Sequence, residues 1–117
     1  MTTAEIAKRV VELNRVGDHL TIYKELYASD AISIENWGEE PEVHRGLEAI
    51  HKKSDMWMES VEEIHETSCS EALVSDSSFA ITFTMDVTYK TMGRISMTEL
   101  AVYTVKNGKI VKEEFQA

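Results

Sequence analysis

Residues 95–115, "ISMTELAVYTVKNGKIVKEEF", are typical of two β-strands joined by the dipeptide Asn107–Gly108. Asn-Gly is favoured in two-residue hairpin turns, where both positions need a positive φ. Successive side chains of a strand point to opposite faces, so one face of the first strand is a mostly apolar row. That row contains Ile95, Met97, Glu99, Ala101, Tyr103 and Val105. The pattern predicts a hairpin and places a carboxyl group in the middle of an apolar surface.

Two turn geometries are open for this hairpin, and they give different registers. A two-residue turn at Asn107–Gly108 mixes polar and apolar residues on both faces. A type I turn with a G1 bulge, in which Gly108 takes the left-handed position, sets Glu99 opposite Phe115 and separates the residues better. We therefore favour the bulge. It gathers on one face Met97, Glu99, Ala101, Tyr103, Val105, Val111, Glu113 and Phe115.

The fold class follows from a change of hydrophobic period along the chain. Residues 79–89, "FAITFTMDVTY", alternate apolar and polar side chains, as a strand with one buried face does. Turn signals at Asp76–Ser77, Met92–Gly93 and Asn107–Gly108 divide the chain after residue 60 into four long strands. The sequence thus predicts an antiparallel sheet in its second half.

Helices are predicted before that sheet. Thr2 and Glu5 have the spacing of a capping box for a first helix, and Asp18 can cap a second helix with Tyr27 on its apolar face. A short strand is expected over residues 31–35, and a third helix follows Gly46. The class is α+β, with three helices and one sheet.

Composition limits the classes of function. With 117 residues, 43% of them hydrophobic, we expect a single domain over residues 1–117. A formal net charge of -9 argues against nucleic acid, and the apolar runs fall far short of the roughly 20 residues that span a membrane. With one cysteine, Cys69, and no leader-like start, we expect a cytoplasmic protein. Metal-ligand spacings and phosphate-binding glycine loops are lacking, so neither a metal nor a cofactor is expected.

Glu99 and Glu113 have two interpretations. An uncompensated buried carboxylate is unfavourable by several kcal/mol, so each must be paired, hydrated or protonated. In the first interpretation Tyr103, His65 or Arg94 satisfies them structurally. In the second they line a ligand pocket, where an acid with a perturbed pKa can move protons. The residues alone leave both open.

The opposite face of the sheet predicts an oligomer. Thr82, Thr84, Asp86 and Thr88 form a row of short side chains, which a second copy can cover. We expect a homodimer with Leu100 and Val102 near the centre of the interface.

The order of these elements resembles the nuclear transport factor 2-like superfamily, and within it the SnoaL-like and ketosteroid-isomerase-like proteins. The resemblance covers nearly the whole chain and rests on "GDHLTIYKELYASDAISIENWGEEP" (17–41), "RGLEAI" (45–50) and "NGKIV" (107–111). It implies a cystatin-like roll, in which helices and a strongly curved antiparallel sheet form a cone around a pocket. It also implies a homodimer formed through the sheet.

The resemblance assigns candidate roles one residue at a time. Glu35 matches the carboxylate that shuttles the substrate proton in ketosteroid isomerases. Val10 and Ala101 occupy the places of that family's two oxyanion donors, a tyrosine and a protonated acid. Neither side chain can donate a hydrogen bond, which argues against steroid isomerisation. A protonated Glu99 or Glu113 is the candidate substitute donor.

Together these inferences predict a cofactor-free acid/base enzyme that isomerises, cyclises or dehydrates a compact, largely apolar carbonyl compound. Glu35 takes the proton, and Glu99 or Glu113 stabilises or returns it. The alternative is a non-catalytic domain that binds a ligand or associates with another chain, because fold does not fix function. The expected pocket residues are Val10, Trp37, Trp57, Phe83, Met85, Tyr103 and Phe115.

Overall fold

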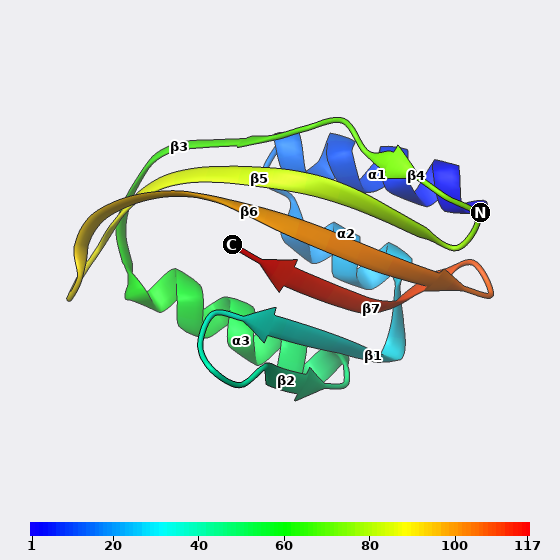
Figure 1. Ribbon diagram of the computed structural model, residues 1–117, viewed down its shortest axis with the longest axis horizontal. Coiled ribbons are helices and arrows are strands. Elements are labelled where there is room, and N and C mark those ends of the chain that lie inside the picture. The colour runs from blue at the N-terminus through cyan, green and yellow to red at the C-terminus, as the bar shows by residue number, and fades with distance from the viewer.

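The computed structural model describes residues 1–117 and contains three helices and seven strands. The three helices and two of the strands lie within residues 1–60, and the rest of the chain contains strands alone (Figure 1). The elements are α1 (Thr3–Arg15), α2 (His19–Leu26), β1 (Tyr27–Asn36), β2 (Glu42–Arg45), α3 (Leu47–Ser60), β3 (Val61–Cys69), β4 (Leu73–Val74), β5 (Ser78–Tyr89), β6 (Gly93–Lys106) and β7 (Lys109–Gln116).

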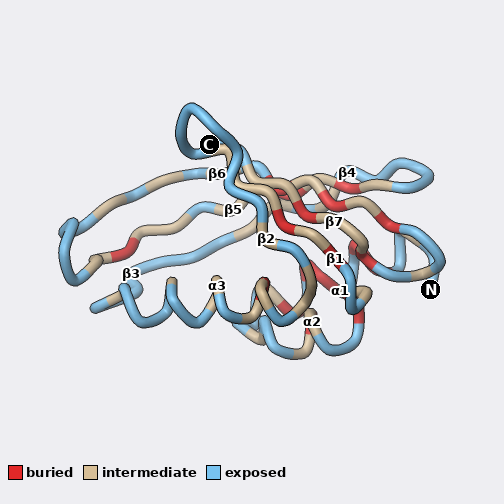
Figure 2. The backbone as a smooth tube through the Cα atoms, turned by 90° about the horizontal axis from the view of Figure 1, so that it is seen from below, coloured by how far each residue is buried: buried red, intermediate tan, exposed pale blue.

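One curved, unclosed sheet contains all seven strands, in the order β2-β1-β7-β6-β5-β3, with β4 added beside β5. All three helices lie on one side of this sheet, and the other side carries none (Figure 2). The predicted α+β class and curved sheet are confirmed. The sheet is mixed rather than wholly antiparallel, because β1 runs parallel to β7.

The predicted bulge at the β6–β7 turn is wrong in position. Lys106 pairs with Lys109, and Asn107 and Gly108 both have positive φ, 54° and 73°, so the turn has two residues. The register then shifts between Val105 and Thr104, which leaves Val111 as the extra residue. Beyond the bulge, the predicted and the observed register place the same residues on each face of the sheet. Glu99 and Glu113 therefore face the same side, as predicted, while Ile110 replaces Val111 on that side.

The core lies between the helices and the inner face of the sheet. Ile6 and Val10 of α1 are fully buried there with Ile81 of β5 and Ala101 of β6. The capping box of Thr2 and Glu5 is present, and it fixes the start of the helix that contributes most to this core.

Two elements differ from the sequence prediction. Tyr27 was expected on the second helix, but it begins β1, where its side chain still reaches the core. Strand β2 was not predicted, because it begins at Glu42, the last residue of the acidic, turn-rich stretch "NWGEEPE" (36–42). None of the helices combines the length and apolar character needed to cross a membrane.

Candidate functional site

The strand registers bring the three candidate acids to the inner face of the sheet. In the parallel pair, Ser33 of β1 lies beside Glu113 of β7, and Glu35 lies beside Phe115. On the other side of β7, Tyr103 of β6 pairs with Glu113. Glu99 lies on the same face of β6 as Tyr103, because the two are separated by an even number of residues. These side chains come from three adjacent strands.

Glu113 is buried and fully paired. Its side chain is 2% exposed, and it accepts hydrogen bonds from the Tyr27 hydroxyl and, at 2.6 Å, from Ser33 Oγ. Lys53 Nζ of α3 lies 3.0 Å from the same carboxylate and donates to Ser33 Oγ at 2.8 Å. The lysine also lies 4.7 Å from the centre of the Phe115 ring. Glu113 thus belongs to a buried ion pair that is satisfied by three donors.

The partners proposed for the acids in the structural interpretation were wrong. His65 instead contacts Thr88 on the edge of the sheet, at 2.6 Å. Arg94 pairs with Asp86 through two hydrogen bonds of 3.0 and 2.8 Å. Tyr103 stacks on a core phenylalanine and makes no side-chain hydrogen bond with either acid.

Glu99 differs from Glu113 because its half-buried carboxyl group makes no hydrogen bond or ion pair. Burial raises the pKa of Glu99 to about 7, and the negative charge of Glu35 adds to this effect. The Lys53 ammonium acts in the opposite direction, and Glu113 again raises the value. Glu99 is therefore an acid that can hold or release a proton near neutral pH.

Glu35 lies at the border of the sheet with its side chain 18% exposed. The indole nitrogen of Trp37 donates to Glu35 Oε2 at 2.9 Å. His44 Nε2 of the neighbouring strand lies 3.4 Å from Glu35 Oε1. The candidate base is thus oriented by two side chains that flank it.

Two tyrosines near these acids stay neutral over a wide pH range. Burial raises the pKa of Tyr103 well above its usual value, and the charge of Glu113 raises it further. The same two causes raise the pKa of Tyr27. Both phenols therefore stay protonated, and Tyr27 donates its proton in the hydrogen bond to Glu113.

The expected pocket residues occupy different environments. Val10 is part of the closed core, and Trp37 is 43% exposed. Trp57 donates to the Tyr89 hydroxyl at 3.1 Å. The remaining four lie on the inner face of the sheet, with Tyr103 buried and the other three partly exposed: Phe83, Met85, Tyr103 and Phe115.

Exposure on the inner face varies along β5 and β6. The first inner residues of β5, Phe79 and Ile81, are buried, and Val87 further along is buried as well. Between them Phe83 and Met85 are partly exposed, as are their neighbours on β6, Glu99 and Met97. We call these four residues, Phe83, Met85, Met97 and Glu99, the inner window; through it the inner face is accessible beside the acids.

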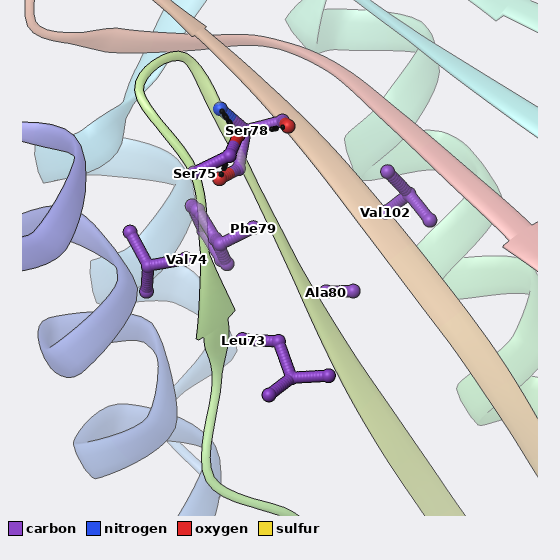
Figure 3. Close-up of a pocket in the computed structure, with 7 residues that line it drawn as sticks. All are labelled: Leu73, Val74, Ser75, Ser78, Phe79, Ala80 and Val102. Carbon is purple, nitrogen blue, oxygen red and sulfur yellow. Dashed lines mark hydrogen bonds between the residues drawn. The ribbon is translucent and has the colours of Figure 1, made fainter.

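Two of the three surface hollows contain none of the candidate acids. The first, of about 220 Å³, lies beside β4, and its lining includes Leu73, Val74, Ala80 and Val102 (Figure 3). The second, of about 420 Å³, lies between α1 and the segment around Glu71 and Ala72. The predicted pocket at the three acids therefore stays a prediction.

Sequence reasoning missed Lys53, Ser33 and Tyr27, which surround Glu113. One signal for Lys53 exists, because it follows the buried Ile50 by three residues and precedes Trp57 by four. Residues at this spacing share one face of a helix, so the lysine had to point toward the sheet. Ser33 lacks such a signal, since its partner lies 80 residues further along the chain.

The comparisons with known proteins agree with this architecture. A structure from Mesorhizobium loti, provisionally assigned as a SnoaL-like polyketide cyclase [carbohydrate phosphatase], is 41% identical, with a TM-score of 0.93 and full coverage of both chains. More distant structures share the fold. One from Xanthomonas campestris, of unknown function and cystatin-like fold, has 20% identity and a TM-score of 0.79 over 98% of this chain and 89% of that one.

A third structure, from Catenulispora acidiphila, has a ketosteroid isomerase-like fold and contains trimethylamine. It shows 14% identity and a TM-score of 0.74 over 99% of this chain and 87% of that one. Among curated proteins, none matches this chain significantly. The model of the SnoaL-like domain family matches residues 1–116. With this match over nearly the whole sequence, the chain belongs to the SnoaL-like domain family.

Proposed function

We propose that this protein is a cofactor-free acid/base catalyst that moves protons next to the carbonyl group of a compact, largely apolar substrate. The observation that carries the proposal is Glu99, an unpaired acid with a pKa of about 7 beside the apolar side chains of the inner window. An acid of this kind can donate or accept a proton at neutral pH. Isomerisation, cyclisation and dehydration all begin with such a proton transfer.

Glu35 and Glu99 have different parts in this mechanism. The Glu35 carboxylate removes a proton from the carbon next to the carbonyl, and the electron pair moves to the carbonyl oxygen. Protonated Glu99 donates a hydrogen bond to that oxygen and stabilises the developing enolate. Glu35 then returns its proton to a different carbon of the enolate. In ring closure the carbanion instead attacks a second carbonyl of the same molecule, the C=O π electrons move to that oxygen, and Glu35 gives its proton to the new alkoxide.

Glu113 is a weaker candidate for the donor than Glu99. Its two oxygens already accept from Tyr27, Ser33 and Lys53, so it acts as a carboxylate acceptor in a closed network. The Lys53 ammonium is held by the same network and adds a positive charge near the site. This charge supports the stabilisation of an enolate next to Glu99.

The assignment of the Mesorhizobium loti relative supports the same reaction class. Its provisional name includes a polyketide cyclase, and ring closure between carbonyl groups proceeds through an enolate. The same name also includes a carbohydrate phosphatase. The inner window favours the first activity, because Phe83, Met85 and Met97 form an apolar surface with few polar groups for a sugar phosphate.

Hydrogen exchange tests the proposal without knowledge of the natural product. Cyclic ketones and 1,3-diketones are first screened for binding by thermal shift, and exchange of their α-protons with D2O is then followed by NMR. Glu35→Gln is expected to keep binding and to lose exchange by about a hundredfold or more. The control is Glu66→Gln on the exposed strand β3, which removes the same charge and leaves exchange unchanged.

The pH profile tests the role of Glu99 separately. Exchange by the wild type is expected to fall above about pH 7, when Glu99 loses its proton and can no longer donate. Glu99→Gln keeps a donor at every pH, so this alkaline fall disappears. Exchange in Glu35→Gln at the wild-type rate, or an unchanged alkaline limb in Glu99→Gln, would contradict the mechanism.

We also propose a homodimer formed through the face of the sheet that carries no helix. Thr82, Thr84 and Thr98 are exposed there, and Leu100 is 40% exposed. The hollow of Figure 3 adds the apolar side chain of Leu73, which pairs with Ala80 on this face. Light scattering should give twice the 13.3 kDa of one chain, and Leu100→Glu should give the monomer mass. A wild-type mass of one chain at micromolar concentration would exclude the dimer.

A further inference from the structure

A second chemical site lies on the β1–β2 hairpin, where three metal-binding side chains converge. Glu35 of β1 and Glu42 of β2 are direct cross-strand partners, and His44 lies two residues beyond Glu42 on the same face. His44 Nε2 is 3.4 Å from Glu35 Oε1 and 3.2 Å from Glu42 Oε1. All three ligand atoms lie within 4.8 Å of one another.

This cluster has an excess of negative charge. Two carboxylates that face each other directly across strands repel. The negative charge is increased by Glu39 and Glu40 in the connecting loop. His44 Nε2 is buried and makes no hydrogen bond, although it lies at ion-pair distance from both carboxylates. A buried nitrogen without a hydrogen bond can be satisfied by a bound cation.

Two of the three separations between the ligand atoms match those around a metal ion. Histidine nitrogens and carboxylate oxygens bind Zn²⁺ at about 2.0 to 2.2 Å. Neighbouring ligands around such an ion are then roughly 3 to 3.5 Å apart, for tetrahedral or octahedral geometry. The two observed distances from His44 Nε2, 3.4 and 3.2 Å, fall in this range. The ion would take the place between the three atoms.

The surroundings of the cluster orient its ligands. The indole of Trp37 donates to Glu35 Oε2, so Oε1 remains turned toward His44. Hydrogen bonds from side chains that do not themselves bind the ion fix the direction of metal-binding carboxylates. Two carboxylates also balance the charge of a divalent cation, while the neutral imidazole adds a nitrogen ligand.

We propose that Glu35, Glu42 and His44 bind a divalent transition-metal ion, for which Zn²⁺ is the probe. Linear spacing did not reveal this site, because its ligands meet only through the pairing of β1 with an unpredicted strand. The remaining coordination positions are open to water or to an oxygen atom of a ligand. Because the ion uses Glu35, a loaded protein cannot use that carboxylate as a base, and Zn²⁺ is expected to inhibit the proposed proton exchange.

Calorimetry on the chelator-treated full chain tests the site directly. Zn²⁺ is expected to bind one equivalent per chain, and Glu42→Gln and His44→Gln should each weaken binding by at least about tenfold. Glu40→Gln is the matched control, because it removes the same charge from the same hairpin without removing a ligand. Its affinity should stay within about twofold of the wild type.

If a variant fails to fold, NMR of the wild type tests the metal site instead. In ¹⁵N NMR of the wild type, added Zn²⁺ should shift His44 Nε2 and leave the other histidines, His19, His51 and His65, unchanged. Equal weakening by Glu40→Gln and Glu42→Gln, or no selective shift of His44, would overturn the proposal. Binding is measured without substrate and proton exchange without metal, so failure of the metal site and failure of the proposed function are distinguishable.

Discussion

Glu113 and Glu99 lie on the same face of one sheet, but their surroundings differ. Glu113 is shielded from solvent: only 2% of its side chain is exposed, and its oxygens are satisfied by Tyr27, Ser33 and Lys53. Glu99 lies in the inner window, where burial acts on a carboxyl group without a partner and raises its pKa to about 7. The difference indicates that pairing, more than depth, decides which carboxyl group is structural and which is available for chemistry.

Among the predicted changes in stability, the largest should come from removing the Lys53 ammonium. Lys53→Met keeps most of the apolar stem but leaves the Glu113 carboxylate buried without its cation. Breaking a buried ion pair in this way is unfavourable by about 3 to 5 kcal/mol. We expect a loss of this size in the free energy of unfolding, measured with urea at pH 7.

The neighbouring lysine provides a matched control. Lys52 is exposed and makes no ion pair, so Lys52→Met should change the stability by less than about 0.5 kcal/mol. The double variant Lys53→Met with Glu113→Gln should recover part of the loss, because no charge then remains buried. Similar stability of the two single lysine variants would show that Glu113 does not depend on Lys53.

Loss of one hydroxyl group should have a smaller effect. Tyr27→Phe keeps the ring in the core but removes a donor to the buried Glu113 carboxylate. Leaving a buried acceptor short of one donor reduces the stability by about 1 to 3 kcal/mol. The measurement is again urea unfolding at pH 7.

Tyr103→Phe is the control for this substitution. Tyr103 is also buried, but its hydroxyl makes no side-chain hydrogen bond, so its removal should change the stability less. An equal loss in both variants would mean that the network around Glu113 has no special contribution.

The face on which each acid lies could be predicted from the sequence, and its partners could not. Alternation in residues 95–105 places Glu99 on the same face as Ala101 and Tyr103. This holds for both positions of the bulge. The turn itself was harder, because a bulge at Gly108 and one at Val111 separate apolar from polar residues equally well. The hydrophobic pattern therefore determines which face of the sheet each side chain takes, but not which residues pair across the hairpin.

The partners of Glu113 depend on contacts over long sequence distances. Lys53, Ser33 and Tyr27 precede Glu113 by 60, 80 and 86 residues. They meet it because β1 pairs in parallel with β7 and α3 crosses the same face. Local patterns contain no information on that parallel pairing, so the closed network around Glu113 became visible only in three dimensions.

The smallest predicted effect concerns Glu99 and has a definite sign. Its pKa is about 7 in the folded chain and near 4.5 when unfolded. Between these values the folded chain binds more protons than the unfolded chain, so this group reduces stability as the pH rises from about 4.5 to 7. Glu99→Gln removes the effect and should stabilise the protein at pH 8 relative to the wild type, but not at pH 4.5.

We expect the difference at pH 8 to be on the order of 1 kcal/mol, because water at the half-exposed side chain screens the interaction. Urea unfolding of both proteins at pH 4.5, 6 and 8 measures it, and subtraction cancels the titration of all other groups. Glu62→Gln, at an exposed position of β3, controls for the change in net charge. A stability difference between Glu99→Gln and the wild type that is constant with pH would mean that Glu99 titrates as a solvated acid. Glu99 and Glu113 would then differ in burial alone.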